Sequence, residues 1–176
     1  QAFRDRWRLA AGEPVIGAVG RLAAGRVKGF DLLLDAACLL TQQFPSLHVV
    51  IAGDGPRTAW LAQKIDASGL GERVHLTGAE TDVRVPLALM DVFVFPVRGN
   101  EGFGLSLIEA MAAGKPVVAS RVGAVPDIVQ HGRSGCLVNP EDPPSLAEGI
   151  ARLLNDRAEA QRLAAAGRQR VRERFT

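Results

Sequence analysis

Short apolar segments alternate with helical segments along the whole chain, and this alternation constrains the fold more than any other feature. Six segments are rich in β-branched residues and are predicted to be strands. Most are continuously apolar, as expected for strands that helices cover on both faces. They span residues 14–20, 47–53, 73–78, 91–96, 116–120 and 135–139. Helices are predicted over 30–44, 56–67, 83–90, 105–113, 124–131, 145–154 and 158–175.

This order of elements predicts an α/β fold. Its connections are right-handed crossovers, so the strands should form a doubly wound, Rossmann-like parallel sheet of about six strands. The sequence has no internal repeat, low-complexity tract or linker, and 176 residues suffice for one sizeable core. Residues 1–176 are therefore expected to be a single domain. Because the chain starts at Gln1 and stops within a predicted helix, we expect it to be a piece of a longer protein.

Composition excludes several classes of function. The net charge of +2 is too small to indicate a nucleic-acid partner. Cys38 and Cys136 lie far apart in apolar runs, which favours buried reduced thiols over a disulfide or a metal site. No apolar run approaches the length of a membrane span. Together these features predict a reducing, cytoplasmic setting.

Ligands of doubly wound sheets bind beyond the carboxyl ends of the strands, so the residues after each strand are the candidates for a site. In the segment VGRLAAGRVKGFD, Arg21 follows the first strand and Lys28 precedes the first helix. Two cations around a glycine-containing loop suit a phosphate-like anion, although a solvated basic loop explains them at least as well. The loop has neither GxGxxG nor GxxxxGK[ST], which disfavours dinucleotide and P-loop sites.

The segment NEGFGLSLIEAMAAGKPVVAS, residues 100–120, carries two carboxylates around a glycine-flanked turn. Gly102 and Gly104 allow a sharp turn, so free N–H groups at the start of the next helix can face an anion. Glu101 is either a ligand contact or a simple helix-cap charge. Glu109 is the only charge in a helix that we expect to be covered on most faces, where an unpaired carboxylate would be costly. It should therefore accept from a ribose diol or pair with a neighbouring arginine.

Taken together, these segments resemble the C-terminal, donor-binding domain of group 1 (family 4) retaining glycosyltransferases of the GT-B architecture. The matching motifs are GRL…KGFD, VVIAGDGP, VHLTG, DVFVFP…NEGFGLSLIEAMAAGKPVVAS and GAVPDIVQHGRSGCLVNPEDPPSLAEGIARLL, which cover nearly the whole chain. The spacing of Glu101 and Glu109 within EGFGLxLxEAMAxGxPVVA is the most specific of these signals. The resemblance implies one half of a GT-B architecture, with the N-terminal acceptor-binding domain absent from this chain.

The resemblance also implies a role for each motif residue. Arg21 and Lys28 would neutralise the donor diphosphate as it departs, while Glu101 would contact the transferred sugar; these three would be catalytic. Glu109 would hold the ribose diol, and backbone N–H groups of the turn before its helix would meet the sugar and the distal phosphate. The nucleobase would lie near residues 78–83. The full set expected in the site is Gly20, Arg21, Lys28, Glu101, Gly102, Phe103, Gly104, Leu105 and Glu109.

The family resemblance extends to substrates and partners. It implies a hexosyl-type glycosyltransferase that needs no metal and uses a nucleotide-diphosphate sugar, a UDP-sugar first and a GDP-sugar next. The acceptor, a glycan, lipid or small molecule, would be held by the missing domain, so the isolated chain should be inactive. The full enzyme could act at the inner face of the cytoplasmic membrane. Six residues separate Arg21 from Lys28, more than in the commoner family pattern, so Arg26 could share the role of Lys28.

Two other functions remain open at this level. One is a nucleotide-sugar epimerase or hydrolase of the same fold, which would need its own acid and base near the sugar. The other is a non-catalytic nucleotide-binding module.

Overall fold

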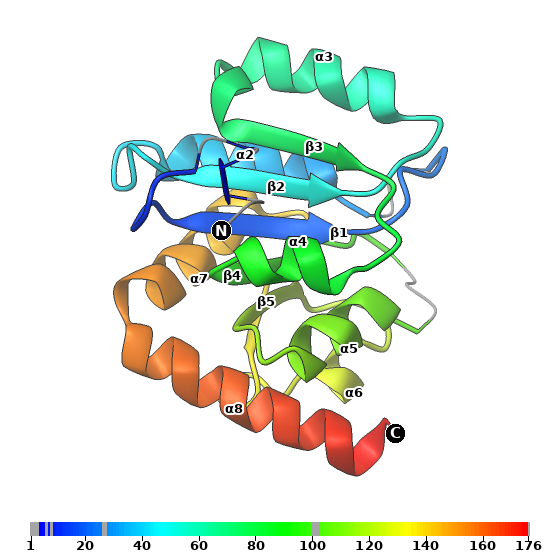
Figure 1. Cartoon of the computed structure of the whole chain (residues 1–176). Helices are drawn as coiled ribbons and strands as arrows, with labels where there is room; N and C mark the ends of the chain where they lie inside the picture. Colours follow the sequence, from blue (N-terminus) through cyan, green and yellow to red (C-terminus); the bar gives the residue numbers. More distant parts are fainter. Residues whose placement is uncertain (1–3, 6, 8, 26–27, 100–102, 176) are drawn as a thin grey trace.

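Six parallel strands form one sheet in the order β3-β2-β1-β4-β5-β6 (Figure 1). The computed structural model describes residues 4–5, 7, 9–25, 28–99 and 103–175. All six strands lie within the predicted apolar segments, which confirms the doubly wound, Rossmann-like sheet. The strands are β1 (Val15–Val19), β2 (His48–Ala52), β3 (Val74–Gly78), β4 (Val92–Phe95), β5 (Val117–Ser120) and β6 (Cys136–Val138).

The described helices follow the predicted pattern, but two of them end several residues earlier than expected. The first ends at Leu40 because the Thr41 hydroxyl donates to the Cys38 carbonyl (2.8 Å) and competes with the helical ladder. The fifth, predicted over 124–131, ends at Ile128, since Val129 adopts an extended conformation. The helices are α2 (Phe30–Leu40), α3 (Thr58–Ser68), α4 (Arg84–Leu89), α5 (Leu105–Ala112), α6 (Val125–Ile128), α7 (Pro143–Asn155) and α8 (Arg157–Arg174), with a 3-10 turn η1 (Gly71–Arg73).

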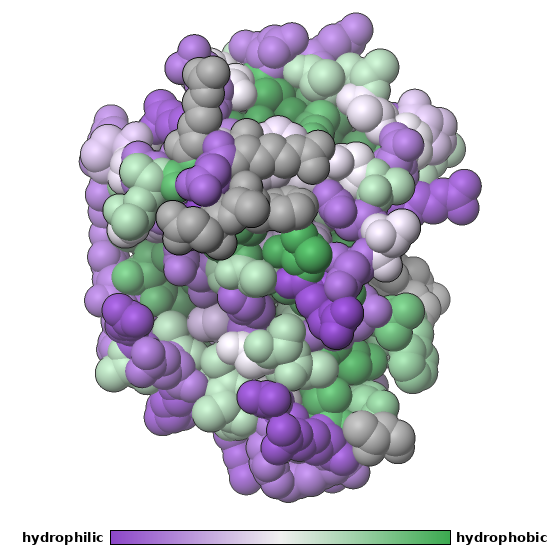
Figure 2. All heavy atoms as spheres, in the orientation of Figure 1, coloured by the Kyte–Doolittle hydropathy of each residue, from purple (hydrophilic) through white to green (hydrophobic). Residues whose placement is uncertain are grey.

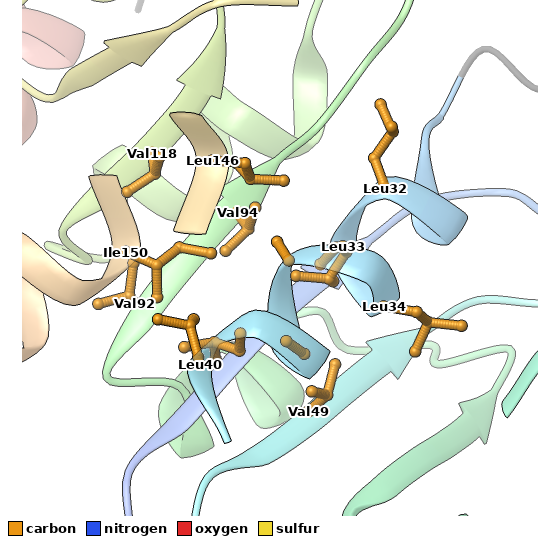
Figure 3. Packing of buried hydrophobic residues seen from close by; sticks show 14 of the residues in the cluster. Leu32, Leu33, Leu34, Leu40, Val49, Val92, Val94, Val118, Leu146 and Ile150 are labelled. Atoms are coloured by element: carbon orange, nitrogen blue, oxygen red, sulfur yellow. The ribbon is translucent and has the colours of Figure 1, made fainter. Parts of the chain in front are cut away.

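Helices cover both faces of the sheet and divide the core into two clusters. α2, α3 and α7 supply one cluster, whereas α4, α5 and α6 supply the other, and α8 contributes to both. In the first cluster Leu33 of α2 and Ile150 of α7 are fully buried and pack around Val94 of β4 (Figure 3). Burying each such side chain contributes about 1.5–3 kcal/mol to stability. The two clusters therefore stabilise the sheet whose carboxyl edge carries the candidate site.

The strand order creates a switch point between β1 and β4. The chain first runs outward from β1 to β3, then returns to place β4 beside β1 and runs outward the other way. Ile16 of β1 pairs with Val92 of β4, which sets their carboxyl ends next to each other. Open α/β sheets bind ligands in the crevice at such a point. The loops after β1 and β4 therefore border one crevice, although they are far apart in the sequence.

Candidate functional site

Lys28 folds back over the carboxyl end of β1. Its aliphatic chain passes beside Gly20, and a Cβ added at Gly20 would be in van der Waals contact with Lys28 Cδ at 3.5 Å. Its Nζ lies 6.0 Å from the centroid of the Phe95 ring, the last residue of β4. The ammonium group therefore stands between the ends of β1 and β4, at the switch point. Gly20, which was predicted to belong to the site, lies against the lysine chain.

Arg21 is exposed at the same edge of the sheet. Hydrogen bonds on both sides hold its backbone: Gly20 N donates to Ala52 O (2.9 Å) and Leu22 N donates to Asp54 O (3.0 Å). Its guanidinium makes no hydrogen bond or ion pair with any residue that the structure describes. A cation on a fixed backbone without a protein counter-ion suits an anionic ligand.

The amino end of α5 faces the crevice from the β4 side. Gly104 precedes the helix in the left-handed conformation (φ 62°) and accepts from the Leu107 and Ile108 N–H groups (3.0 and 3.1 Å). The N–H groups before Leu107 therefore lie ahead of the first intrahelical bonds and are available to an anion. Phe103 and Leu105 are 68% and 61% exposed. Besides Leu39, they are the only large apolar side chains exposed among the described residues.

Glu109 is half-buried, and the expectation that α5 is covered on most faces is wrong. α5 buries Leu107, Ile108, Ala110 and Met111 against the core. Glu109 lies one turn after the exposed Leu105, on the same face of the helix. Among the described residues it has no hydrogen bond or ion pair, so no arginine of this part of the chain neutralises it. The helix is amphipathic, and Glu109 lies outside the set of residues that it buries.

Three residues of the prediction, Arg26, Glu101 and Gly102, lie outside the described residues.

A hollow opens beyond the carboxyl ends of β1, β2 and β3, beside Arg21. The stretch predicted to lie near a nucleobase, residues 78–83, forms one of its walls. Asp54 at its rim already serves the start of α3, because its Oδ1 accepts from Gly55 N (2.7 Å) and Thr58 Oγ1 (2.9 Å). These hydrogen bonds hold the pKa of Asp54 below its usual range. The residues around the hollow include Val19, Gly20, Arg21, Gly53, Glu80 and Val83.

One ion pair beside the crevice escaped the sequence analysis. Asp31, noted in the sequence only as part of the KGFD motif, is 4% exposed and binds both guanidinium nitrogens of Arg98 (2.5 and 3.0 Å). Arg98 belongs to the loop after β4, and three strands separate it from α2 in the sequence. The only sequence signal was an arginine in a segment that follows a strand, which does not reveal its partner.

The remaining polar groups lie outside the crevice. No group of three or more His, Cys, Asp or Glu residues in the described part of the chain could hold a metal ion. Both cysteines are free, and burial raises the pKa of each thiol. Cys136 is buried as predicted, whereas Cys38 is only half-buried. Hydrophilic atoms gather over α8 at the lower edge of Figure 2. Arg168 and Arg172 of this helix are exposed. Within the described residues, no helix is both long and apolar enough to cross a membrane.

An open parallel sheet with two cations and a helix amino end at its switch point is typical of α/β proteins that bind phosphorylated ligands there. Residues 13–156 match the model of one such family, described as Glycosyl transferases group 1. The chain belongs to this family, and the predicted resemblance is confirmed.

Two known proteins illustrate the relationship. The GDP-mannose-dependent alpha-(1-6)-phosphatidylinositol monomannoside mannosyltransferase of Mycobacterium tuberculosis is 34% identical over 177 aligned residues, covering 96% of this chain and 45% of that protein. The crystal structure of HepE from Anabaena in complex with UDP-glucose is 30% identical with a TM-score of 0.90, covering 99% of this chain and 48% of that one. The chain thus spans about half the length of these relatives.

A second structure locates the match within the family. The C-terminal domain of LpcC, a glycosyl transferase group 1 family protein from Francisella tularensis, is 26% identical with a TM-score of 0.81. The match covers 98% of this chain and 92% of that domain. This chain therefore corresponds to the C-terminal half of a GT-B architecture.

Proposed function

We propose that this domain binds a nucleotide-diphosphate sugar, and that the full enzyme transfers the sugar, with retention, to an acceptor held by a separate N-terminal domain. The observation that carries the proposal is the position of Lys28, whose chain crosses Gly20 and brings an ammonium group beside the end of β4. Together with the exposed Arg21, it gives the crevice two cations. The same crevice receives the amino end of α5.

These groups suit the departure of a nucleoside diphosphate. The diphosphate gains negative charge as the bond to the sugar breaks, and fixed positive groups stabilise that charge more in the transition state than in the ground state. Arg21 can bind phosphate oxygens in a forked geometry, whereas Lys28 acts as a point charge. The N–H groups at the start of α5 supply a third, uncharged contact. The leaving diphosphate therefore needs no carboxylic acid to protonate it.

The two glutamates would contact the rest of the donor. Glu109 lies half-buried without a partner among the described residues, and its two oxygens can accept from both hydroxyls of a ribose. Glu101 would meet the hydroxyls of the transferred sugar and support the positive charge that develops at its anomeric carbon. Backbone N–H groups of residues 102–105 would meet the sugar and the distal phosphate.

The nucleobase would occupy the hollow beyond β1, β2 and β3, against residues 78–83. A UDP-sugar is our first candidate and a GDP-sugar the second, because the HepE complex contains UDP-glucose and the mycobacterial relative depends on GDP-mannose. We propose a hexose as the transferred sugar. The exposed apolar pair Phe103 and Leu105 supports a second surface that closes over this edge. The isolated chain should therefore bind donor but transfer nothing.

The direct test is calorimetric titration of the chain with UDP, GDP and ADP, repeated on Arg21→Ala and Glu109→Ala. One nucleotide should bind saturably, and each substitution should weaken it by about tenfold or more, since a hydrogen bond to a charged group contributes about 1.5–3 kcal/mol. Arg168→Ala on α8 and Glu148→Ala on α7 are matched controls, because both residues are exposed and lie outside the crevice. Their affinities should equal that of the parent chain.

Two results with the variants, besides a failure of the parent chain to bind any of the three nucleotides, would contradict the proposal. Binding that neither substitution affects would remove the assigned roles of Arg21 and Glu109. Equal weakening by the control substitutions would show that net charge, not a defined site, governs the affinity.

A further inference from the structure

Arg98 connects three segments that are distant in the sequence. It follows β4 by a short loop, and both its terminal nitrogens bind the Asp31 carboxylate of α2. Its Nε also lies 3.7 Å from Glu141 Oε2, in the loop between β6 and α7. A forked arginine–carboxylate pair fixes orientation as well as distance. The pair therefore sets how the loop after β4 lies against the start of α2.

The Asp31 end of this pair is withdrawn from water. Its side chain is 6% exposed, and that of Arg98 is 18% exposed. Burial alone would raise the pKa of Asp31, but the hydrogen bonds and the charge of Arg98 lower it below its usual range. An ion pair in this setting is screened little by solvent, unlike an exposed one. The ion pair can therefore hold the loop after β4 in one arrangement against the start of α2.

Backbone packing presses the same two loops together. Gly29, between Lys28 and α2, adopts the left-handed conformation (φ 64°). A Cβ added there would lie 1.8 Å from the carbonyl oxygen of Pro96, two residues before Arg98. The loop that carries Lys28 and the loop that leads to Glu101 thus touch at Gly29 and Pro96, and the ion pair joins them close by.

Glu141, which joins Asp31 and Arg98 as the third charged residue of this group, has a strained backbone conformation. Glu141 is the only residue besides glycine with positive φ in the described part of the chain (φ 54°). Such conformations persist where surrounding contacts determine them, and they concentrate near functional sites. In this conformation the Glu141 carboxylate lies beside Nε of Arg98, whereas Asp31 binds the two terminal nitrogens. Arg98 is thus bracketed by two carboxylates from different loops.

We propose that Arg98 is a positioning residue that holds the Lys28 loop and the loop after β4 in register, so that both face one nucleotide ligand. This inference rests on the proposed function, because it takes Lys28 as a ligand contact. Arg98 itself is directed to Asp31 and need not touch the ligand. Loss of the pair would let the two loops separate and would weaken the contact that Lys28 makes.

The test is the calorimetric affinity for whichever of UDP, GDP and ADP the parent chain binds. Arg98→Met should weaken it by about tenfold, as expected when one charged contact is misplaced. Arg152→Met is the matched control. Arg152 makes a similar forked pair with Glu159 (Nε–Oε2 2.8 Å) that joins α7 to α8, and its loss should leave the affinity unchanged. In a Lys28→Ala background, Arg98→Met should have little further effect, because both changes remove the same contact.

A second variant guards against unfolding, since removing Arg98 alone leaves a buried carboxylate unpaired. The double substitution Asp31→Asn with Arg98→Gln removes both charges together and should weaken binding to a similar extent. A merely structural role would lower the stability of these variants but not the affinity of the folded molecules.

The possible results of these titrations distinguish a failure of the proposed function from a failure of the positioning role of Arg98. If the parent chain binds none of the three nucleotides, the proposed function fails and this inference fails with it. If the parent binds one and the Arg98 variants bind it equally well, only the positioning role is overturned. An equal loss in Arg152→Met, or fully additive losses in the Lys28→Ala background, would also overturn that role.

Discussion

Substitution of Gly29 by alanine tests how closely the two loops of the crevice are packed. The change adds one methyl group at a residue with φ 64°, where its Cβ would lie 1.8 Å from Pro96 O and 2.8 Å from Pro96 C. The left-handed conformation alone costs a residue with a Cβ about 1–2 kcal/mol. The clash adds about 1–3 kcal/mol of overpacking, because a backbone carbonyl cannot rotate away as a side chain can. We therefore expect Gly29→Ala to lower the free energy of unfolding by about 2–5 kcal/mol.

Gly69→Ala provides the matched control for this substitution. Gly69 ends α3 with φ 72°, and no atom lies within 4 Å of an added Cβ. Gly69→Ala has the conformational cost without the clash, so it should lower the free energy of unfolding by about 1–2 kcal/mol. Urea denaturation followed by far-UV circular dichroism measures both variants, and their m-values should match that of the parent. Equal losses for Gly29→Ala and Gly69→Ala would refute the close approach to Pro96.

Two further predictions concern regions away from the crevice. Burial lowers the pKa of His48 and of His75, which lie 3.0 Å apart (Nδ1 to Nε2), so the unfolded chain binds more protons than the folded one below about pH 6.5. Stability by urea denaturation should therefore fall between about pH 7 and about pH 5, and it should fall less in His75→Gln; an equal fall in both would contradict this assignment. Asp142 caps α7 by accepting from Ser145 N (2.9 Å), so Asp142→Ala should cost about 0.5–2 kcal/mol of unfolding free energy. Asp142→Asn keeps an acceptor and should cost much less; if it costs as much as Asp142→Ala, the cap is not the cause.

Local patterns predicted the elements of the fold well. Strands buried on both faces require continuous apolar runs, and such runs are visible in the sequence without knowledge of any partner. The helix boundaries were less accurate where side chains compete with the helical ladder, as Thr41 does at the end of α2. The rule that ligands bind after the strands also predicted Arg21, Lys28 and the turn before α5 as site residues.

Exposure within a helix was harder to predict. The run around Glu109 is rich in apolar and small residues, which suggested a helix covered on most faces. The packing of α5 instead buries only the stripe that contains Leu107 and Met111, and leaves Glu109 half-buried. Which stripe of a helix is covered depends on its neighbours, and an alanine-rich stretch fits either environment.

By itself, the sequence determined the number, type and order of the elements, the family, and the residues that could serve a donor site. Only the tertiary structure decided that β4 lies beside β1, that Lys28 reaches the end of β4, and that Asp31 pairs with Arg98. The physical reason is the range of the interactions. Strand and helix formation reflects residues that are neighbours in the chain, whereas sheet order and ion pairs between loops join segments that meet only after the chain has folded.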